Sequence, residues 1–271
     1  MAAWSEIELS KVEHYRIDAE FYQPKYLEAQ LIAGKKRLKH FGVEVIHPTE
    51  VKRVYSDNGL RIMLAQNNRD NFYDWTIERF MPTKMRSVLA TNQLNSGDVT
   101  VTRSGANFGQ TSVITMETDE SDIYACADLL IIKTKLISGP LLSTYLNSKV
   151  GKLLMERGVY GAGQPHVAPS YVKEIQFPEI LLSHSDKIEE LLVETRQKSH
   201  LSKCLYKQAQ ELLIKGLRLD ELVFPKVLYS TSSFEKVING HRLDAQHYQS
   251  KFDILIDHLK SFPNQLISEI C

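Results

Sequence analysis

Several predicted loops carry long polar side chains whose types suit contacts with DNA bases. Arginine can donate two hydrogen bonds to guanine, and asparagine or glutamine can form two with adenine. Such side chains gather at 65–72, 77–87, 103–110 and 161–169, and the last two segments also contain glycines. The candidate DNA-contacting residues are Gln66, Asn67, Asn68, Arg69, Arg79, Lys84, Arg86, Arg103, Asn107, Gln110, Gln164 and His166.

The same loop residues also have a plainer role. Clusters of asparagine and glycine commonly form turns in which the side chains bond to their own backbone. The glycines of 103–110 also allow the backbone to approach a phosphate, a contact that positions a protein without reading sequence. His166 alone is more often a hydrogen-bonded loop histidine than a catalyst. Turn formation and DNA contact therefore remain alternatives for each residue.

Catalytic motifs have little support in the sequence. A methyltransferase needs a glycine-rich cofactor loop and an Asn/Asp-Pro-Pro-aromatic turn, and the chain has neither. The glycines at 105–109 lack the Gly-Lys-Ser/Thr ending of a phosphate-binding loop. A metal-dependent nuclease site can be drawn from Asp18, Glu50 and Lys52, with the last two on one strand face, but chance produces such triples. We expect no enzyme activity, no cofactor and no metal.

The composition is that of a globular protein whose formal net charge is zero. The 271 residues are 43% hydrophobic, and 33 basic residues balance 33 acidic ones. Any affinity for DNA must therefore come from a local surface. Cys126, Cys204 and Cys271 are odd in number and have no Cys-x-x-Cys spacing, which favours reduced thiols in a cytoplasmic protein. The apolar runs are too short for an export signal or a membrane span.

The elements that must position these loops are predicted as strands followed by helices. Strand patterns occur at 97–105, 111–116 and 127–134, and the last is apolar enough to be a central strand. An apolar stripe over 139–158 predicts a helix or a helix pair. The fold class expected for the region from about 45 to 178 is therefore α+β, with a mixed or antiparallel sheet.

A long helix is predicted after residue 183, because the sequence has neither proline nor glycine before Gly216. At 1.5 Å per residue such a helix would be about 50 Å long. Heptad positions alternate small residues with leucine, which favours close pairing with another long helix. The candidate helix-pairing residues are Ile188, Leu191, Thr195, Ser202, Leu205, Ala209 and Leu212. The alternative is a helix packed on the surface of its own domain.

One sequence motif, called the repeated phrase below, occurs twice. The segment from Arg16 returns at Arg242, an offset of 242 − 16 = 226, as "RIDAEFYQPKY" and "RLDAQHYQSKF". Pro24 in the first copy and Ser250 in the second are different helix-start signals at the same position. A long-period repeat predicts that one structural unit is used twice.

The order of these motifs resembles the specificity subunit of type I restriction-modification systems. The phrases that carry the resemblance are "RIDAEFYQPKY", "GDVTVTRSGANFGQ", "YLNSKVGK", "GAGQPHVAPSYVKEIQFPEI", a long helix and then "RLDAQHYQ". The resemblance implies a target recognition domain followed by a spacer helix, in two tandem halves, with the paired helices setting the distance between two DNA half-sites. It also implies double-stranded DNA, modification (methyltransferase) subunits and a restriction (translocase/nuclease) subunit as partners.

On this resemblance we expect a target recognition domain at 1–182, a spacer or dimerisation helix with linker at 183–229, and the start of a second repeat at 230–271. The second half departs from the family pattern because it stops at Cys271. This is expected either of a cut chain or of a half-sized subunit that forms a homodimer through its long helix. A helical assembly protein that binds only protein partners is the alternative function.

Overall fold

The computed structural model describes residues 5–13, 16–105, 107–115, 122–161, 165–225 and 229–263. The chain divides into two compact units, a first unit of residues 1–196 and a second unit of residues 197–271. This division falls inside the long helix rather than near residue 182. The reason is that the first turns of that helix belong to the first unit, where Ile188 packs against the core and Arg196 donates to the Thr115 carbonyl oxygen at 3.3 Å.

The first unit is built on a four-stranded antiparallel sheet. Its strands are β1 (Glu44–Ile46), β4 (Val99–Thr102), β5 (Thr111–Val113) and β7 (Leu129–Lys133), in the order β1-β7-β4-β5. Strand β7 is flanked on both sides, as its apolar sequence predicts. Leu130 and Ile132 face one hydrophobic core, whereas Leu129 and Ile131 face a second core. This alternation places a core on each face of the sheet.

A smaller sheet covers the second core. It consists of β2 (Leu60–Met63), β3 (Phe80–Met81) and β6 (Ile123–Ala125), in the order β3-β2-β6. Strand β2 pairs antiparallel with β3 and parallel with β6. Leu60, Ile62 and Ile123 are buried in this core, together with Leu129 and Ile131 from the larger sheet. The two sheets therefore share one hydrophobic layer.

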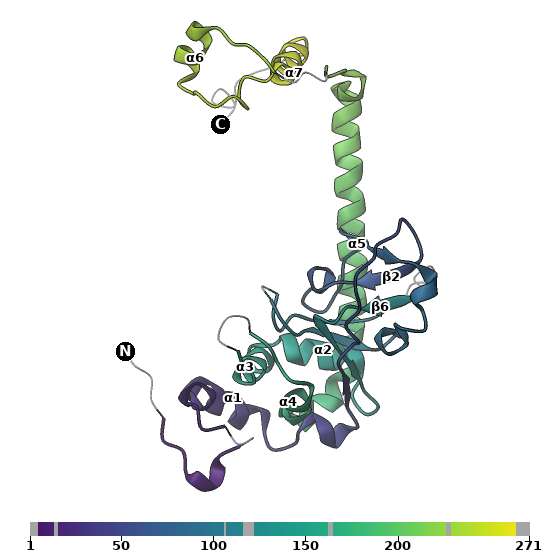
Figure 1. The fold of residues 1–271 in the computed structure, drawn as a ribbon, viewed down its shortest axis with the longest axis vertical. Helices are drawn as coiled ribbons and strands as arrows, with labels where there is room; N and C mark the ends of the chain where they lie inside the picture. Colours follow the sequence, from purple (N-terminus) through teal and green to yellow (C-terminus); the bar gives the residue numbers. More distant parts are fainter. Residues whose placement is uncertain are drawn as a thin grey trace. The chain divides into compact units, whose positions relative to one another are not determined.

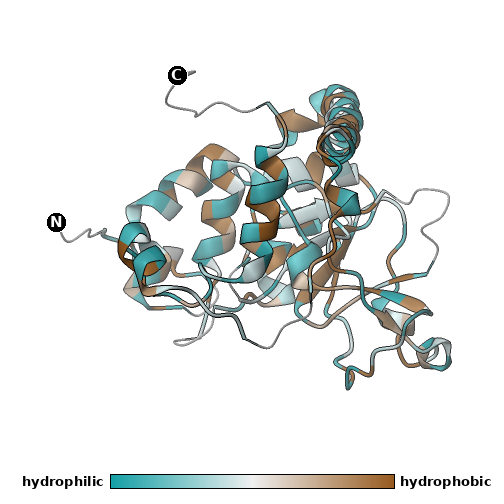
Figure 2. Cartoon of the chain, turned by 90° about the horizontal axis from the view of Figure 1, so that it is seen from above, coloured by the Kyte–Doolittle hydropathy of each residue, from teal (hydrophilic) through white to brown (hydrophobic). Residues whose placement is uncertain are grey.

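Helices cover the other face of the larger sheet (Figure 1). They are α1 (Pro24–Ala33), α2 (Gly139–Asn147), α3 (Lys149–Arg157) and α4 (Pro169–Glu174). Their ribbons alternate between hydrophobic and hydrophilic residues (Figure 2), as expected for helices with one buried side. The sequence predicts a helix or a helix pair at 139–158, and the structure has a pair. The break falls at Ser148, whose hydroxyl accepts the Gly151 N–H at 3.1 Å and caps α3.

Short 3₁₀ helices connect these elements. They span Leu9–Lys11, Ala19–Tyr22, Leu38–Phe41, Ala65–Asn67, Thr83–Met85, Ala90–Asn92, Glu179–His184 and Leu219–Glu221. Together the strands and helices confirm the expected α+β class.

The predicted long helix is α5 (Ser185–Gly216), a single 32-residue element. None of its residues is fully buried. Two shorter helices follow, α6 (Phe234–Gly240) and α7 (Ser250–Lys260), and His258 of α7 contacts the Leu217 carbonyl oxygen within the second unit. In the parts of the chain that the structure describes, no helix is both long and apolar enough to cross a membrane.

The repeated phrase forms the same structure twice, which we name the first module (residues 16–33) and the second module (residues 242–259). In the first module Arg16 Nε lies 2.6 Å from Asp18 Oδ2, and the Asp18 carboxylate accepts the Phe21 N–H at 3.1 Å. Tyr22 donates its hydroxyl to the Arg16 carbonyl oxygen at 2.9 Å.

The second module repeats each of these bonds at the expected offset. Arg242 Nε lies 2.7 Å from Asp244 Oδ2, and the Asp244 carboxylate accepts the His247 N–H at 3.0 Å. Tyr248 donates to the Arg242 carbonyl oxygen at 2.7 Å. Helix α7 begins at Ser250, which is the position that corresponds to Pro24 of α1. The sequence repeat is therefore a repeat of hydrogen bonds as well.

Candidate nucleic-acid interface

The loop that joins β4 to β5 is a tight turn over 103–110. Its base is closed by hydrogen bonds from Thr102 N to the Gln110 carbonyl oxygen at 2.8 Å and from Gly109 N to the Thr102 carbonyl oxygen at 2.9 Å. Gly105 and Gly109 have φ angles of +89° and +78°. Glycine adopts this left-handed backbone without steric cost, which explains both glycines. The turn holds Arg103, Asn107 and Gln110 at its edges.

A second predicted loop lies directly beside this turn. Ser104 forms an isolated antiparallel bridge with His166, and His166 forms a second bridge with Tyr160. The Tyr160 and His166 backbones exchange hydrogen bonds of 3.0 and 3.1 Å. Two segments about sixty residues apart in sequence are thus joined through their backbones. We call the resulting surface the polar rim; its candidate side chains are Arg103, Asn107, Gln110 and His166.

Three rim side chains carry a buried polar atom with no hydrogen-bond partner among the described residues. These atoms are Arg103 Nε, Gln110 Oε1 and His166 Nδ1. Buried polar atoms in proteins are almost always bonded, so unmatched ones mark places that need explanation. Among the described residues, Thr115 Oγ1 and Thr144 Oγ1 are the other buried side-chain atoms of this kind, so the rim residues contribute three of five.

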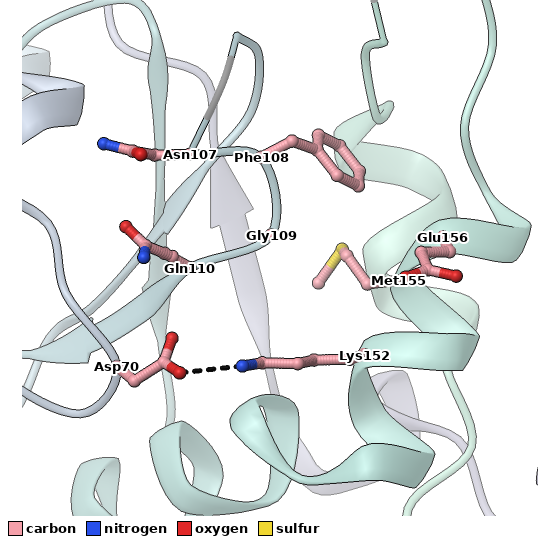
Figure 3. Close-up of a pocket in the computed structure, with 8 residues that line it drawn as sticks. All are labelled: Asp70, Asn107, Phe108, Gly109, Gln110, Lys152, Met155 and Glu156. Atoms are coloured by element: carbon pink, nitrogen blue, oxygen red, sulfur yellow. Dashed lines mark hydrogen bonds and ion pairs between the residues drawn. The ribbon is translucent and has the colours of Figure 1, made fainter.

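A cleft of about 250 Å³ lies between the turn and helix α3 (Figure 3). Its lining residues are Asp70, Asn107, Phe108, Gly109, Gln110, Lys152, Met155 and Glu156. Lys152 Nζ donates to Asp70 Oδ2 at 2.7 Å and closes one end of the cleft. Phe108 packs against the hydrophobic core that contains Met155 of α3, and both residues line the cleft (Figure 3), so the turn is packed against that helix.

Asn67 and Asn68 are buried below the rim instead of lying on it. Asn68 Nδ2 donates to the Gln110 carbonyl oxygen at 2.7 Å and to Thr102 Oγ1 at 3.1 Å. Asn67 Oδ1 accepts the Leu64 N–H at 2.9 Å, and both residues are at most 1% exposed. Their amides have the turn-forming role that the sequence left open, and Asn68 positions the β4–β5 turn.

Asn68 belongs to a polar network that sequence reasoning missed. The hydroxyl of Thr100, on the inner face of β4, donates to Asn68 Oδ1 at 3.1 Å and lies 2.9 Å from Ser112 Oγ. Asn147 at the end of α2 donates to the Thr111 carbonyl oxygen at 2.6 Å. Thr100 and Thr102 of β4 can therefore be buried because their hydroxyls form hydrogen bonds with Asn68. The spacing of the threonines in the sequence does not reveal these bonds.

The remaining candidates lie elsewhere in the first unit. Gln66 and Arg69 are exposed, and Arg69 Nε lies 3.1 Å from Asp74 Oδ2. Arg79, Lys84 and Arg86 lie next to strand β3 of the small sheet and are exposed. Gln164 lies outside the described residues.

Arg79 and Arg86 are both held by neighbours. The guanidinium of Arg79 lies 5.8 Å from the centre of the Tyr55 ring. Arg86 Nη2 donates to Asp122 Oδ2 at 2.7 Å, and this hydrogen bond lowers the pKa of the Asp122 carboxyl. The charge of Arg86 is thereby partly neutralised.

His47 and Arg53 stand next to Arg103. Arg103 Nη1 lies 3.1 Å from His47 Nε2. Arg53 Nη2 lies 2.6 Å from Asp128 Oδ2, a hydrogen bond that raises the Arg53 pKa, and the Asp128 carbonyl oxygen accepts the Arg103 N–H at 2.8 Å. Neither Arg53 nor His47 is among the candidate residues drawn from the sequence.

The nuclease alternative loses its geometric basis. Glu50 and Lys52 lie in a segment without strand structure, so they do not share a strand face. The Asp18 carboxylate is bound to Arg16 and to the Phe21 N–H. Among the described side chains, no group of three or more His, Cys, Asp or Glu residues is arranged to hold a metal ion.

Comparison with known proteins finds a distant likeness to solved structures. No protein-family model and no curated protein matches the chain. One solved structure, described as "Structural basis underlying complex assembly and conformational transition of the type I R-M system", aligns with a TM-score of 0.40 and 13% identity. The alignment covers 66% of this chain and 44% of that chain, so this chain spans less than half the length of the solved one. A type I R-M system is thus among the solved structures that the chain distantly resembles.

Proposed function

We propose that the chain is a DNA target recognition subunit of a type I restriction-modification complex and that the polar rim reads one half-site. The type I restriction-modification system is inferred from the sequence resemblance. The observation that carries the role of the rim is the backbone pairing of Ser104 with His166, because it brings two separately predicted polar loops onto one surface. Arg103, Asn107, Gln110 and His166 offer the donors and acceptors that base edges require.

The local charge around the rim fits contact with a phosphate backbone. Arg53 stands beside Arg103, and Lys152 lies across the cleft. Asp128 and Asp70 pair with two of these cations and hold them in fixed positions. Such a surface needs no net positive charge on the whole chain, because contacts to DNA depend on the local field.

We assign no catalytic step to this chain under the proposed function. The methyl-transfer and cleavage chemistry belongs to modification and restriction subunits, and this chain contributes recognition and docking. The exposed apolar side chains of α5 support a docking role. Leu205 is 53% exposed and Leu212 is 72% exposed, seven residues apart on the same helix face. Ile188 packs on the core of its own unit, so helix pairing begins after it.

The proposal is tested with the full chain bound to its methyltransferase partner. Arg103→Ala and Asn107→Ala should each reduce the preference for the cognate sequence by about 5- to 150-fold, since a two-bond base contact contributes about 1–3 kcal/mol of discrimination. Lys39→Ala is the control, because it removes one exposed positive charge that pairs with Glu174 away from the rim. Competition gel shifts with cognate and scrambled duplexes measure the preference.

A protein-only scaffold is the second candidate function. The observation that favours it is the pairing of several candidate cations with carboxylates, as in Arg86 with Asp122 and Arg69 with Asp74. A scaffold predicts that the rim variants leave sequence preference unchanged, whereas Leu205→Glu combined with Leu212→Glu abolishes binding of the methyltransferase subunit. The DNA-reading proposal is rejected if both rim variants behave like Lys39→Ala.

A further inference from the structure

One nitrogen of a histidine beside the polar rim has two neighbours that it cannot bond in the same state. His47 directly follows strand β1, and its Nε2 atom lies 3.1 Å from the Ala127 carbonyl oxygen. The same Nε2 atom lies 3.1 Å from Arg103 Nη1. A carbonyl oxygen only accepts a hydrogen bond, and a guanidinium only donates one. The two neighbours therefore require opposite states of Nε2.

The position of the ring hydrogen decides which neighbour is bonded. In a neutral imidazole one ring nitrogen carries a hydrogen and the other has a lone pair. With the hydrogen on Nδ1, Nε2 accepts from Arg103. With the hydrogen on Nε2, the ring donates to Ala127, and the bond to Arg103 is lost. A ring protonated on both nitrogens also donates to Ala127, and its positive charge repels the guanidinium.

The backbone around this histidine is fixed, so a change at Nε2 acts on side chains. Strand β1 pairs with β7, and Arg103 N donates to the Asp128 carbonyl oxygen at 2.8 Å in the loop between β6 and β7. The Asp128 carboxylate lies 2.6 Å from Arg53 Nη2, which places a carboxylate against that second arginine. His47 is exposed, so solvent protons reach its ring. The charged and titratable groups on the segments around the ring are Glu50, Arg53, Arg103, Cys126 and Asp128.

The contact with His47 orients the Arg103 guanidinium. Among the described residues, Arg103 Nε is buried with no hydrogen-bond partner, whereas Nη1 contacts the histidine. Arginine reads guanine with two N–H groups in one plane, so the direction of that plane decides whether both reach the base. A bond from one Nη1 hydrogen leaves the second Nη1 hydrogen and both Nη2 hydrogens for a base edge.

We propose that His47 is a positioning residue for Arg103 and that Nε2 switches the arginine between a held and a released orientation. The held guanidinium recognises guanine with two bonds. The released one keeps its charge, so attraction to phosphates remains while discrimination falls. Histidine ordinarily changes charge between about pH 5 and 8, so sequence preference falls with the pH across this range. The effect on DNA rests on the proposed function of the rim, whereas the exchange of hydrogen-bond partners does not.

The first experiment needs no DNA. Nitrogen-15 NMR of the full chain reports which ring nitrogen of His47 carries a hydrogen, because protonated and unprotonated ring nitrogens differ widely in chemical shift. At about pH 8 the hydrogen should be on Nδ1 in the native chain, since Arg103 donates to Nε2. Arg103→Ala should move it to Nε2, which then donates to Ala127.

Arg53→Ala is the matched control for this measurement. It removes a neighbouring arginine that bonds to Asp128 and not to the ring, so the hydrogen of His47 should stay on Nδ1. The proposal is overturned by a native ring with its hydrogen on Nε2 at this pH. It is also overturned by a ring state that does not respond to Arg103→Ala.

The second experiment measures DNA preference at about pH 8 and about pH 5.5 with the full chain bound to its methyltransferase partner. Competition between cognate and scrambled duplexes should show a preference about two- to tenfold lower in acid, as expected for one lost hydrogen bond, without weaker binding of the scrambled duplex. His47→Gln should keep the preference at both pH values. Its amide oxygen accepts from Arg103 and its amide N–H donates to Ala127, and the amide does not titrate. His47→Ala should have the lower preference at both.

His166 is the other titratable rim side chain, and His166→Gln controls for it. The ratio of preferences at the two pH values should persist in this variant. A pH dependence that persists in His47→Gln overturns the switch, as does a native preference that is independent of pH while Arg103→Ala lowers it. If Arg103→Ala leaves the preference unchanged, the proposed reading function fails instead, and the NMR measurement still decides whether Arg103 sets the state of the ring.

Discussion

The two modules have the same internal bonds but opposite surroundings. In the first module Phe21 and Tyr26 are 1% and 8% exposed, whereas their counterparts in the second module are open: His247 is exposed, and Phe252 is 39% exposed. The Arg-Asp pair, the cap on the following turn and the tyrosine hydrogen bond form in both. The comparison shows that a short phrase can fix its own conformation, while its contribution to stability depends on what packs against it.

The largest expected difference between the modules comes from removing the aromatic side chain. Phe21→Ala should lower the unfolding free energy of the first unit by about 3–4 kcal/mol, because it empties a buried ring site below Arg157. His247→Ala at the corresponding position should have little effect, since His247 is exposed. Urea unfolding followed by tryptophan fluorescence reports the first unit. Equal losses in the two variants contradict the view that only one module is docked.

A smaller difference is expected when only the hydroxyl is removed. Tyr22 donates to the Arg16 carbonyl oxygen and accepts the Glu13 N–H at 2.8 Å. Tyr22→Phe leaves both backbone groups without this partner, so the cost should be about 1–2 kcal/mol. Tyr248→Phe should cost less, because the corresponding carbonyl can bond to water. Urea midpoints of the two variants measure the difference, and the reverse order argues against burial as its cause.

The sequence predicts what depends on nearby residues and fails where distant segments meet. The repeat, the central strand β7 and the single helix α5 follow from local patterns, and all three are present. Asn68 is of a residue type that can read bases, yet the fold buries it under a turn that comes later in the chain. Its side chain bonds to Gln110 and Thr102, more than thirty residues away, which no local pattern encodes.

The contacts within the polar rim also join distant segments and could not be predicted from the sequence. Sequence reasoning identified Arg103 and His166 separately, on two loops with glycines. Only the fold reveals that Ser104 and His166 are backbone neighbours and that His47 contacts Arg103. The grouping of Arg79, Lys84 and Arg86 with the small sheet likewise depends on how β2, β3 and β6 pair.

A small difference between the modules is expected in how acid changes the stability of the first unit. A hydrogen bond from Arg16 lowers the pKa of Asp18 below its ordinary value of 3.8, so its stabilisation is complete above that value and is lost as the pH falls through the folded-state pKa. Asp18→Asn should therefore reduce the loss of first-unit stability between about pH 5 and 2. The effect is small because the Asp18 side chain is 41% exposed and screened by water. Urea midpoints across this range measure it.

The control for the acid experiment is the second module. Arg242 also lowers the pKa of Asp244 by a hydrogen bond. Asp244→Asn should leave the tryptophan-detected unfolding of the first unit unchanged at every pH, because the residue belongs to the other unit. A change in the acid profile with this variant shows that the two units unfold together.

The labelling rates of the two described cysteines compare the two units without any substitution, because Cys126 lies in the first unit and Cys204 in the second. Burial raises the pKa of the Cys126 thiol from 9.0 to about 11, which makes its thiolate about 100-fold scarcer at neutral pH. Cys204 is exposed on α5. Iodoacetamide at pH 7.5 should therefore label Cys204 at least about 100-fold faster than Cys126 in the native protein, since the thiolate is the nucleophile. Peptide mapping separates the two rates, and labelling in urea should make them similar. Comparable native rates show that the core beneath the small sheet opens to solvent as readily as the surface of α5.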